Sequence, residues 1–303
     1  MWFWLSLLAL LCWSGSDLFS KIGCVGGDDA YSHLKMIMAV GAVMGLHALY
    51  QVTLGGVAVT MRTILGYLPV SLMYILSMAI GYFGLRYIEL SVSSPICNSS
   101  GAVVALLYLI IYGISEDVPA VSIVAIVLVC VGVLALGITE SREDEELRAA
   151  RQSEGNYRYA KSAMAIAIPI VYCLIDALGT FADSMALRKM NEDSANVAYE
   201  LTFLLAGIVC AIYVLGVKKQ KLVPAREIPK YAGALCETAG QFFYIHALSD
   251  TEHVGFSAPM ISAYCVMSVV WGRIFLKEKL SIKHYASIAL VIIGIIILGV
   301  LDI

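Results

Sequence analysis

The sequence predicts an all-α integral membrane protein with ten transmembrane helices, arranged as two inverted five-helix repeats. Composition is the first observation behind this prediction. Of the 303 residues, 60% are apolar and only 14% are charged, and the mean hydropathy is +0.84, whereas soluble domains carry about 25% charged residues. The second observation is that the chain divides into ten mostly apolar stretches. Each is near the length of about 20 residues that a helix needs to cross a bilayer.

The predicted spans are continuous apolar runs, without the alternation that marks the strands of a membrane β-barrel. In chain order they cover residues 2–22, 34–54, 67–88, 92–112, 118–138, 162–187, 197–217, 231–249, 254–276 and 284–301. The longest polar connection has mixed charge and separates the fifth span from the sixth. We therefore expect an N-terminal five-helix repeat over residues 1–138, a charged linker over residues 139–161 and a C-terminal five-helix repeat over residues 162–303.

An internal repeat supports this division. The fourth and fifth spans share an order of features with the ninth and tenth: a proline (Pro95, Pro259), an acid in a polar break (Glu116, Glu278), and two glycines five residues apart in the last span. The glycines are Gly132 and Gly137 in the first copy and Gly294 and Gly299 in the second. The prolines are 164 residues apart, and the acids and glycines are 162 apart. Because five spans is an odd number, the second copy enters the membrane inverted, as in many secondary carriers.

Several function classes are excluded by missing motifs. No GxxxxGK[ST] loop is present, so ATP-driven transport by this chain alone is not expected. There is no HExxH motif, no paired Asp-rich motif and no Cys/His cluster. We therefore expect no enzyme activity, no catalytic residues, no cofactor, no metal site and no nucleic-acid partner.

Short motifs identify a family resemblance. Trp13-Ser-Gly stands near the end of the first span with Lys21 behind it, Phe275-Leu-Lys-Glu278-Lys-Leu-Ser281 precedes the last span, and that span ends in glycines. This pattern resembles the EamA-like branch of the drug/metabolite transporter superfamily, over nearly the whole chain as a five-plus-five layout. The resemblance implies transport of small solutes such as amino acids, amines, choline, drugs or activated sugars, without ATP. Around Glu116 the first repeat departs from the pattern, so no role is carried over to that residue.

Acidic residues inside the predicted spans point to a substrate site, because a charge at the centre of a bilayer is costly. Asp176 and Asp183 are seven residues apart on the sixth span and share one helix face. Glu237, Gln241 and Tyr244 follow at i, i+4 and i+7 on the eighth. On the first span, Asp17 shares a face with Trp13, Ser20 and Lys21.

Structural alternatives stand beside these assignments. Asp17 and Lys21 are four residues apart and could neutralise each other. Asp183 could pair with Arg188, and Glu200, near the start of its span, could simply favour the helix dipole. The bases of the spans lie toward span ends, where long side chains can snorkel to the headgroups. They are Lys21, Arg86, Arg188, Arg273 and Lys277.

Acids therefore outnumber bases at depth, which favours a cationic or zwitterionic amine held against aromatic rings. Nine aromatic residues are candidates for the cavity walls: Trp13, Tyr74, Tyr82, Tyr172, Tyr199, Phe243, Tyr244, Tyr264 and Trp271. The predicted substrate-binding residues are Trp13, Asp17, Tyr74, Asn98, Tyr172, Asp176, Glu237, Gln241, Tyr244 and Tyr264. Three carboxylates are candidates for exchanging a proton with the substrate: Glu237, Asp176 and Asp183.

The leading prediction is a secondary transporter of a small amine or amino-acid-like metabolite, choline-type amines included, working by alternating access and coupled to protons. A nucleotide-sugar or other anionic metabolite exchanger is the alternative, although it would need Lys or Arg at the midplane. A non-transporting membrane receptor or regulatory protein is the alternative of another class. The expected partners are the small-molecule substrate, protons and the lipid bilayer.

We expect a monomeric, multi-pass protein of the cell membrane, of the prokaryotic plasma-membrane type. Of the 20 Lys and Arg residues, 17 lie on the side of the linker between spans five and six. The positive-inside rule places that side in the cytoplasm and both termini outside. The family resemblance implies the reverse orientation, with cytoplasmic termini.

Overall fold

The computed structural model describes residues 2–25, 29–112, 120–142, 162–187, 189–248, 261 and 263–300. All regular secondary structure within these ranges is helical, so the predicted all-α class is confirmed. Most of the predicted linker, as well as Glu116, Arg188 and Pro259, lies outside the described residues.

Helices cover the predicted spans within the described ranges, while residues 249–260, which include the start of the predicted ninth span, lie outside those ranges. The N-terminal half contains α1 (Trp2–Cys24), α2 (Ser32–Thr53), α3 (Met61–Gly84), α4 (Leu90–Cys97), α5 (Ser100–Tyr112) and α6 (Ala120–Ser141). The C-terminal half contains α8 (Ser162–Ala186), α9 (Glu192–Ala211), its π-helical continuation η1 (Ile212–Val217), α10 (Pro224–Leu248), α12 (Tyr264–Ile274) and α13 (Ile282–Val300). Helix α6 thus continues to Ser141, beyond residue 138, where we expected the N-terminal repeat to end.

Five of the helices in the described ranges are long and apolar enough to cross a membrane by themselves. They are Phe3–Cys24, Ser32–Thr53, Met61–Gly84, Ala163–Asp183 and Glu192–Val217. A chain with several such helices is a multi-pass membrane protein. Shorter apolar helices cover Ile123–Leu136, Tyr264–Ile274 and Ile282–Ile297.

One predicted span is broken. Residues 92–112 form two helices, α4 and α5, with the break just after Pro95. Proline has no N–H to donate to the preceding turn, which weakens the helix at this point. Polar side chains satisfy the backbone there: Asn98 Nδ2 donates to the carbonyl of Ser94 at 2.9 Å, and Ser99 Oγ donates to that of Pro95 at 2.8 Å.

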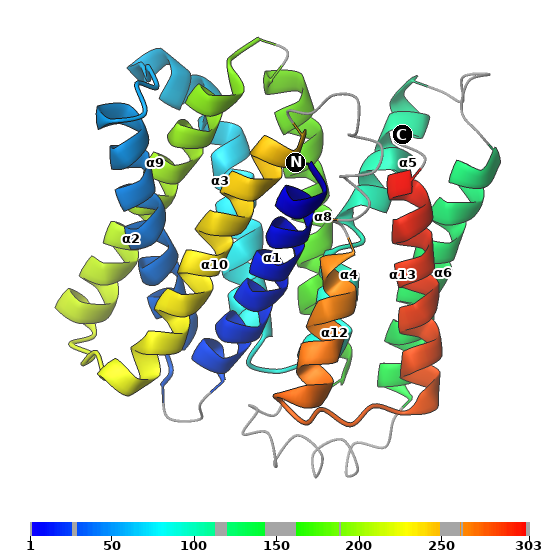
Figure 1. Cartoon of the computed structure of the whole chain (residues 1–303). Coiled ribbons are helices and arrows are strands. Elements are labelled where there is room, and N and C mark those ends of the chain that lie inside the picture. Colours follow the sequence, from blue (N-terminus) through cyan, green and yellow to red (C-terminus); the bar gives the residue numbers. More distant parts are fainter. Residues whose placement is uncertain are drawn as a thin grey trace.

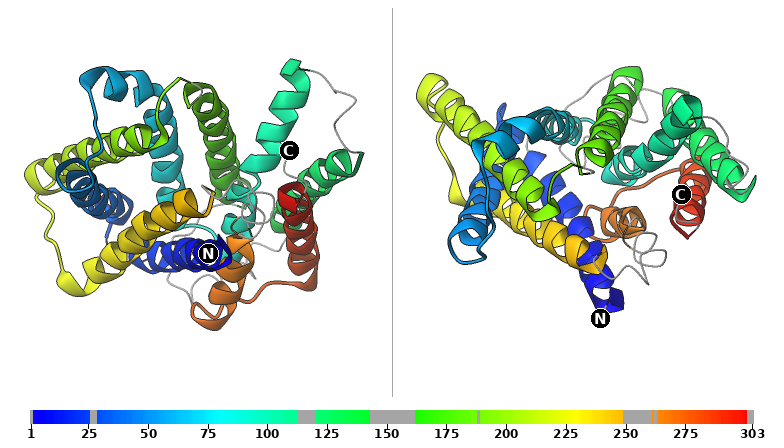
Figure 2. Two further views of the ribbon diagram at one scale, coloured as in Figure 1. Left: turned by 45° about the horizontal axis from the view of Figure 1, so that its top comes forward. Right: turned by 90° about the horizontal axis from the view of Figure 1, so that it is seen from above.

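Helices that are distant in the sequence pack in pairs. Helix α1 packs along α10, α3 along α8, α2 against α9, α6 against α13, and α4 against α12 (Figure 1). The α6–α13 pair lies on the opposite side of the bundle from α2 and α9 (Figure 2). Every one of these pairs joins a helix of the N-terminal half to one of the C-terminal half.

Close approach between α6 and α13 depends on glycine. A Cβ atom at Gly294 would lie 2.5 Å from Val129 Cγ2, and one at Gly132 would lie 2.6 Å from Val291 Cγ2. Small residues at such contacts let two helix backbones approach inside a membrane, where packing and not water drives association. Two of the glycines noted in the sequence therefore serve helix packing.

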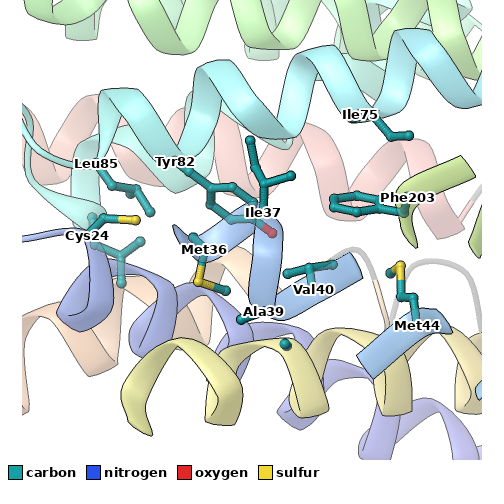
Figure 3. Close-up of a cluster of buried hydrophobic side chains, with 12 residues drawn as sticks. Cys24, Met36, Ile37, Ala39, Val40, Met44, Ile75, Tyr82, Leu85 and Phe203 are labelled. Carbon is teal, nitrogen blue, oxygen red and sulfur yellow. The ribbon is translucent and has the colours of Figure 1, made fainter. Parts of the chain in front are cut away.

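A buried apolar cluster joins α1, α2, α3 and α9 (Figure 3). Its members include Cys24, Met36, Ile37, Val40, Met44, Ile75, Tyr82, Leu85 and Phe203. Dispersion contacts of this kind hold the helices in one arrangement, and the cluster fixes the faces of α1 and α3 that turn toward the centre of the bundle.

The turn between α3 and α4 is held from both sides by charged side chains. Lys21 Nζ donates to the carbonyls of Leu85 and Ile88. The carboxylate of Glu278 accepts the backbone N–H of Leu90 at 2.8 Å and that of Ser91 at 2.9 Å. Glu278 thus caps the N-terminus of α4, where a negative charge is favourable. We call Lys21, Glu278 and the segment 85–91 the α3–α4 clamp.

The prediction that Lys21 and Arg86 snorkel to the headgroups is wrong. Both side chains are buried in the protein, with 1% and 3% of their surface exposed. Arg86 donates to the carbonyls of Ala30 at 2.8 Å and Asp29 at 3.0 Å. Both bind backbone carbonyls of remote segments, and Arg86 Nη1 also lies 3.1 Å from His33 Nδ1. Arg273 and Lys277, in contrast, are exposed as expected.

Buried ion pairs lie next to the clamp. Lys35 Nζ contacts Asp29 at 2.8 Å and Glu227 at 3.6 Å, and Lys230 Nζ contacts Glu227 at 3.1 Å. Burial alone would raise the pKa of Asp29, which lies between α1 and α2, but the hydrogen bonds from Lys35 and from the N–H of Tyr31 lower that pKa below its usual value. These pairs connect the starts of α2 and α10 at the end of the bundle where α1 ends.

Replacing Gly294 by Ala should destabilise the protein by about 1–3 kcal/mol, because the added Cβ overpacks the contact with α6. The carbonyl of Ala125, 2.8 Å from that Cβ, is backbone and cannot rotate away. The control is Gly101→Ala in α5, where no atom lies within 4 Å of the new Cβ. Thermal unfolding in detergent should show a lower melting temperature for Gly294→Ala only, and equal values for both variants would contradict the packing account.

Candidate substrate cavity

A cavity of about 490 Å³ lies between the helices of the two halves. All ten predicted substrate-binding residues line it, and so does Asp183. They come from α1 (Trp13, Asp17), α3 (Tyr74), the end of α4 (Asn98), α8 (Tyr172, Asp176, Asp183), α10 (Glu237, Gln241, Tyr244) and α12 (Tyr264). The structure therefore brings together all ten predicted substrate-binding residues, and their role in binding stays a prediction.

The cavity has a closed end and an open end. Leu85 and Leu90 line it beside the α3–α4 clamp, and both side chains are buried. At the other end it reaches Leu187 and Glu192, between α8 and α9, where Glu192 is exposed. A solute could enter from the end of the bundle that holds the C-terminus of α8, and the clamp lies between the cavity and the opposite end.

Asp17 is held by hydroxyl groups. Its Oδ2 accepts hydrogen bonds from Ser94 Oγ and Ser268 Oγ, each at 2.6 Å. Lys21, the partner considered from the sequence, donates instead to backbone carbonyls of the clamp. Two short hydrogen bonds to one carboxylate oxygen stabilise its charge without neutralising it.

The two carboxylates of α8 also have hydroxyl partners. Asp183 accepts from Tyr67 OH at 2.6 Å and from Tyr74 OH at 3.4 Å. Asp176 accepts from Ser77 Oγ at 3.5 Å and also interacts with the hydroxyl of Ser100. As for Asp17, the donors are neutral hydroxyl groups, and no base of the described residues forms an ion pair with either carboxyl group.

Glu237 and Gln241 present polar atoms from α10. Glu237 forms a side-chain hydrogen bond with Ser16 of α1 and lies within electrostatic range of Asp17 and Asp176. Gln241 Nε2 donates to Asn196 Oδ1 at 3.4 Å. Three carboxylates from α1, α8 and α10 thus surround one region of the cavity.

The charges that line the cavity are all of one sign. Five acids face it, namely Asp17, Asp176, Asp183, Glu192 and Glu237, and no Lys, Arg or His appears among the described residues that line it. A water-poor space with one sign of charge attracts the opposite charge strongly, because screening is weak there. The cavity can therefore hold a cation or protons, and it repels anions.

Aromatic rings complete the wall. The Trp13 ring lies 5.1 Å from that of Tyr244 and 5.7 Å from that of Tyr264, measured between centroids. Trp13 packs over Gly240, where a Cβ would lie 2.5 Å from its Cδ1. Ring faces attract ammonium groups, with a contribution of about 0.5–2 kcal/mol that rises with desolvation.

Two of the nine proposed wall aromatics do not line the cavity. Phe243 packs in a separate cluster with Ala9, Ala247 and Ile261. Trp271 Nε1 donates to Ser14 Oγ at 3.1 Å. Helical spacing placed both rings on plausible faces, but packing against neighbouring helices turns them away.

Sequence reasoning missed several cavity residues. Tyr67 precedes Tyr74 by two helical turns, and this spacing could have identified it as a member of the same face. Ser94 and Ser268 gave no signal, because serine is common in membrane helices and donates wherever a partner lies. Asn196 lines the cavity from α9, and nothing in its local sequence distinguishes it.

Glu200 has a different role from the one expected. It is not an exposed acid that only favours the α9 dipole: 1% of its surface is exposed, and its Oε1 lies 2.8 Å from His47 Nδ1 of α2. Neither residue lines the cavity. Glu200 therefore belongs to the shell of side chains behind the cavity wall.

Comparison with known families agrees with this geometry. Residues 163–300 match the model of the EamA-like transporter family, which is part of the drug/metabolite transporter superfamily. The chain is thus similar to the EamA-like transporter family over residues 163–300. No curated protein matches the chain.

This similarity suggests a membrane transporter of the drug/metabolite type. Members of the EamA-like family are transporters and not enzymes. The match spans α8 to α13, so it contains Asp176 and Glu237. The resemblance seen in the sequence is therefore confirmed for the family, and the family match by itself leaves the substrate class open.

Replacing Ser268 by Ala should cost about 1–3 kcal/mol of stability, because it removes a short hydrogen bond to the Asp17 carboxylate. The matched control is Ser71→Ala in α3, since Ser71 is also buried and its hydroxyl has no hydrogen-bond partner in the described part of the chain. Melting curves in detergent should show a lower midpoint for Ser268→Ala than for Ser71→Ala. The hydroxyl would have no special role if both changes had the same effect.

Proposed function

We propose that this chain is a secondary transporter of a small cationic or zwitterionic amine or amino-acid-like metabolite, choline-type amines included. The observation that carries the proposal is the one-sided charge of the cavity: five acids and no base among the described lining residues. A bound ammonium group would compensate that charge, and the aromatic wall around Trp13 offers it ring faces. The cavity volume of about 490 Å³ suits a small metabolite.

Nucleotide-sugar or anionic metabolite exchange is the weaker candidate. Phosphate groups need Lys or Arg donors, whereas the buried bases of the described helices bind backbone carbonyls or acids near the closed end. A receptor without transport is also disfavoured, because the family consists of transporters.

Two inverted five-helix repeats, over residues 1–138 and 162–303, are the architecture we propose for transport. Exchanging the halves maps α1 onto α8 and α3 onto α10, so the pair α1–α10 maps onto α8–α3, and both pairs pack. The α6–α13 contact supports the same exchange, because its two glycine–valine contacts differ by 162 residues at each position. Such symmetry allows the same chain to close either end of a central site.

The cavity itself repeats this symmetry. Trp13 packs over Gly240, and Tyr172 packs over Gly81, where a Cβ would lie 2.8 Å from its Cδ2. The offset between the two aromatic residues and between the two glycines is 159 residues, and the same offset relates Asp17 to Asp176. Each half thus contributes one carboxylate from an equivalent helix position.

Alternating access follows from the two ends of the cavity. The α3–α4 clamp and the ion pairs of Lys35 and Lys230 close one end, while the cavity reaches the surface at Glu192. In the opposite state these charged contacts would separate and the equivalent helices would close the other end. No ATP-binding motif is present, so substrate and ion gradients would drive the exchange.

Proton coupling is part of the proposal and rests on Glu237, Asp176 and Asp183. A carboxylate that binds a cation in one state and a proton in the other exchanges the two across the membrane. Proteoliposomes with an imposed pH gradient test this step, and amine transport that ignores the gradient would remove protons from the mechanism.

The proposed location is a cell membrane of the prokaryotic type, with the chain as a monomer. The excess of Lys and Arg on the side of the linker, 17 of 20, favours a cytoplasmic linker and outside termini. With that orientation, the open end of the cavity faces outside, because α8 ends on the side opposite to the linker.

A ligand screen discriminates the substrate classes. A ligand that binds the folded state raises the melting temperature of the purified protein. Choline, aromatic amines and amino acids should stabilise the transporter, whereas nucleotide sugars should not. Stabilisation by nucleotide sugars alone would overturn the proposal.

Replacing Glu237 by Gln should weaken amine binding about ten- to hundred-fold, because a charge-assisted hydrogen bond contributes about 1.5–3 kcal/mol. The protein should still fold, since a neutral amide is easier to place in the membrane than a carboxylate. The control is Asp193→Asn, which removes an exposed carboxylate that does not line the cavity. Titration by thermal shift should show the loss for Glu237→Gln only; equal affinities would take Glu237 out of the site.

A further inference from the structure

Behind the cavity wall, a close contact between the side chains of His47 and Glu200 joins α2 to α9. His47 Nδ1 lies 2.8 Å from Glu200 Oε1. Glu200 is 1% exposed, and its second oxygen, Oε2, is buried without a hydrogen-bond partner among the described residues. An ionised carboxylate that is buried so deeply needs its partners, so His47 and the remaining donor to Oε1 matter for its stability.

The remaining donor starts a chain of hydrogen bonds that leads into the cavity. Asn196 Nδ2 donates to Glu200 Oε1 at 3.3 Å, and Gln241 Nε2 donates to Asn196 Oδ1 at 3.4 Å. Asn196 and Gln241 both line the cavity, whereas Glu200 and His47 do not. These hydrogen bonds therefore link Glu200, which lies behind the cavity wall, to the orientation of the two amide side chains that line the cavity.

The chemistry of these groups determines which of them donates and which accepts each hydrogen bond. An ionised carboxylate only accepts hydrogen bonds, so Asn196 must turn its NH₂ group toward Glu200. Its Oδ1 then faces Gln241, and a carbonyl oxygen also only accepts. Gln241 must consequently turn its own NH₂ group toward Asn196. The Oε1 atom of Gln241, on the other branch of the amide, is the atom left for a ligand.

We propose that the His47–Glu200 pair is a positioning element that sets the polarity of Gln241, so that the cavity offers an acceptor oxygen to the N–H groups of a primary ammonium substrate. The inference rests on the proposed function and narrows it from amines in general to amines that carry N–H donors. Neither His47 nor Glu200 touches the substrate. With the amide of Gln241 reversed, the cavity would present a donor, which an ammonium group cannot use.

Two probes of equal charge, one with N–H donors and the other with three N-methyl groups in their place, test the inference. Phenethylamine and its N,N,N-trimethyl derivative carry the same ring, chain and charge, but the trimethyl compound cannot donate a hydrogen bond. The measured quantity is the ratio of their affinities for the purified full-length protein. Using a ratio removes any effect of a variant on stability or on cation binding as such, since both probes report it equally.

In Glu200→Gln, the ratio should shift about tenfold against phenethylamine. The amide of the new Gln both donates and accepts, so it no longer dictates how Asn196 and Gln241 turn, and one hydrogen bond to a charged group becomes unreliable. The affinity for the trimethyl compound should change little. An unchanged ratio in a folded Glu200→Gln protein would overturn the inference.

Three further single variants and one double variant extend the test, and the single variants do not depend on the folding of Glu200→Gln. Asn196→Ala removes the hydrogen bonds between Glu200 and Gln241 but leaves the His47–Glu200 pair in place. It should produce the same shift of the affinity ratio. Gln241→Leu should produce it too, and adding Glu200→Gln to Gln241→Leu should shift it no further, as expected for residues that act through one another. Glu227→Gln removes another buried, paired carboxylate at the opposite end and should leave the ratio unchanged.

The proposed function and the role of Glu200 can be contradicted separately. A wild-type protein that binds neither probe contradicts the proposed function. A wild-type protein that binds both, with the same ratio in Asn196→Ala and Glu200→Gln, retains the proposed function and rejects the role of Glu200. If Glu200→Gln does not fold, the ratio in Asn196→Ala decides.

Discussion

Uncompensated negative charge inside the bundle is the constraint on which the rest of this structure depends. Asp17, Asp176, Asp183 and Glu237 face one cavity between helices that lie in a membrane. Hydroxyl groups of Ser94, Ser268 and Tyr67 lower the cost of holding these charges, but neutral donors cannot cancel them. A cation or a proton would supply the balance, as the proposed transport of a cationic substrate requires.

The bases of the chain are kept apart from these acids. Lys21 and Arg86 bind backbone carbonyls, and Lys35 and Lys230 bind Asp29 and Glu227, all near the closed end of the cavity. Using the bases to hold one end shut leaves the acids of the cavity without partners. The separation of charge therefore serves closure and binding together, and opening the closed end would expose pairs that water can stabilise.

The sequence allowed the fold class and the acidic part of the site to be predicted, and the reason is energetic. A carboxylate within a long apolar run is costly, so Asp176 and Glu237 stand out from their surroundings without any structural knowledge. The residues that support them do not stand out. Ser268 lies 251 residues from Asp17 in the chain, and its role depends on the packing of α1 against α12.

The wrong predictions have the same cause. Lys21 and Arg86 were assigned to the headgroups because their partners, backbone carbonyls of the α3–α4 turn and of the α1–α2 connection, cannot be recognised in a sequence. For Glu200 the helix dipole was the alternative considered, because its partner His47 lies on another helix and cannot be recognised in the sequence. A local pattern gives the depth and the face of a residue, whereas its partner depends on which helices pack together.

The most direct test of a cation-selective cavity compares two ligands of one shape. Choline and 3,3-dimethylbutan-1-ol differ in that a quaternary nitrogen replaces a carbon, so only the first is charged. Equilibrium binding to the purified wild-type protein should favour choline by at least about tenfold, since each ring–cation or charge contact contributes on the order of 1 kcal/mol or more. Equal affinities would contradict the account, because shape and apolar contact would then explain the binding without the carboxylates.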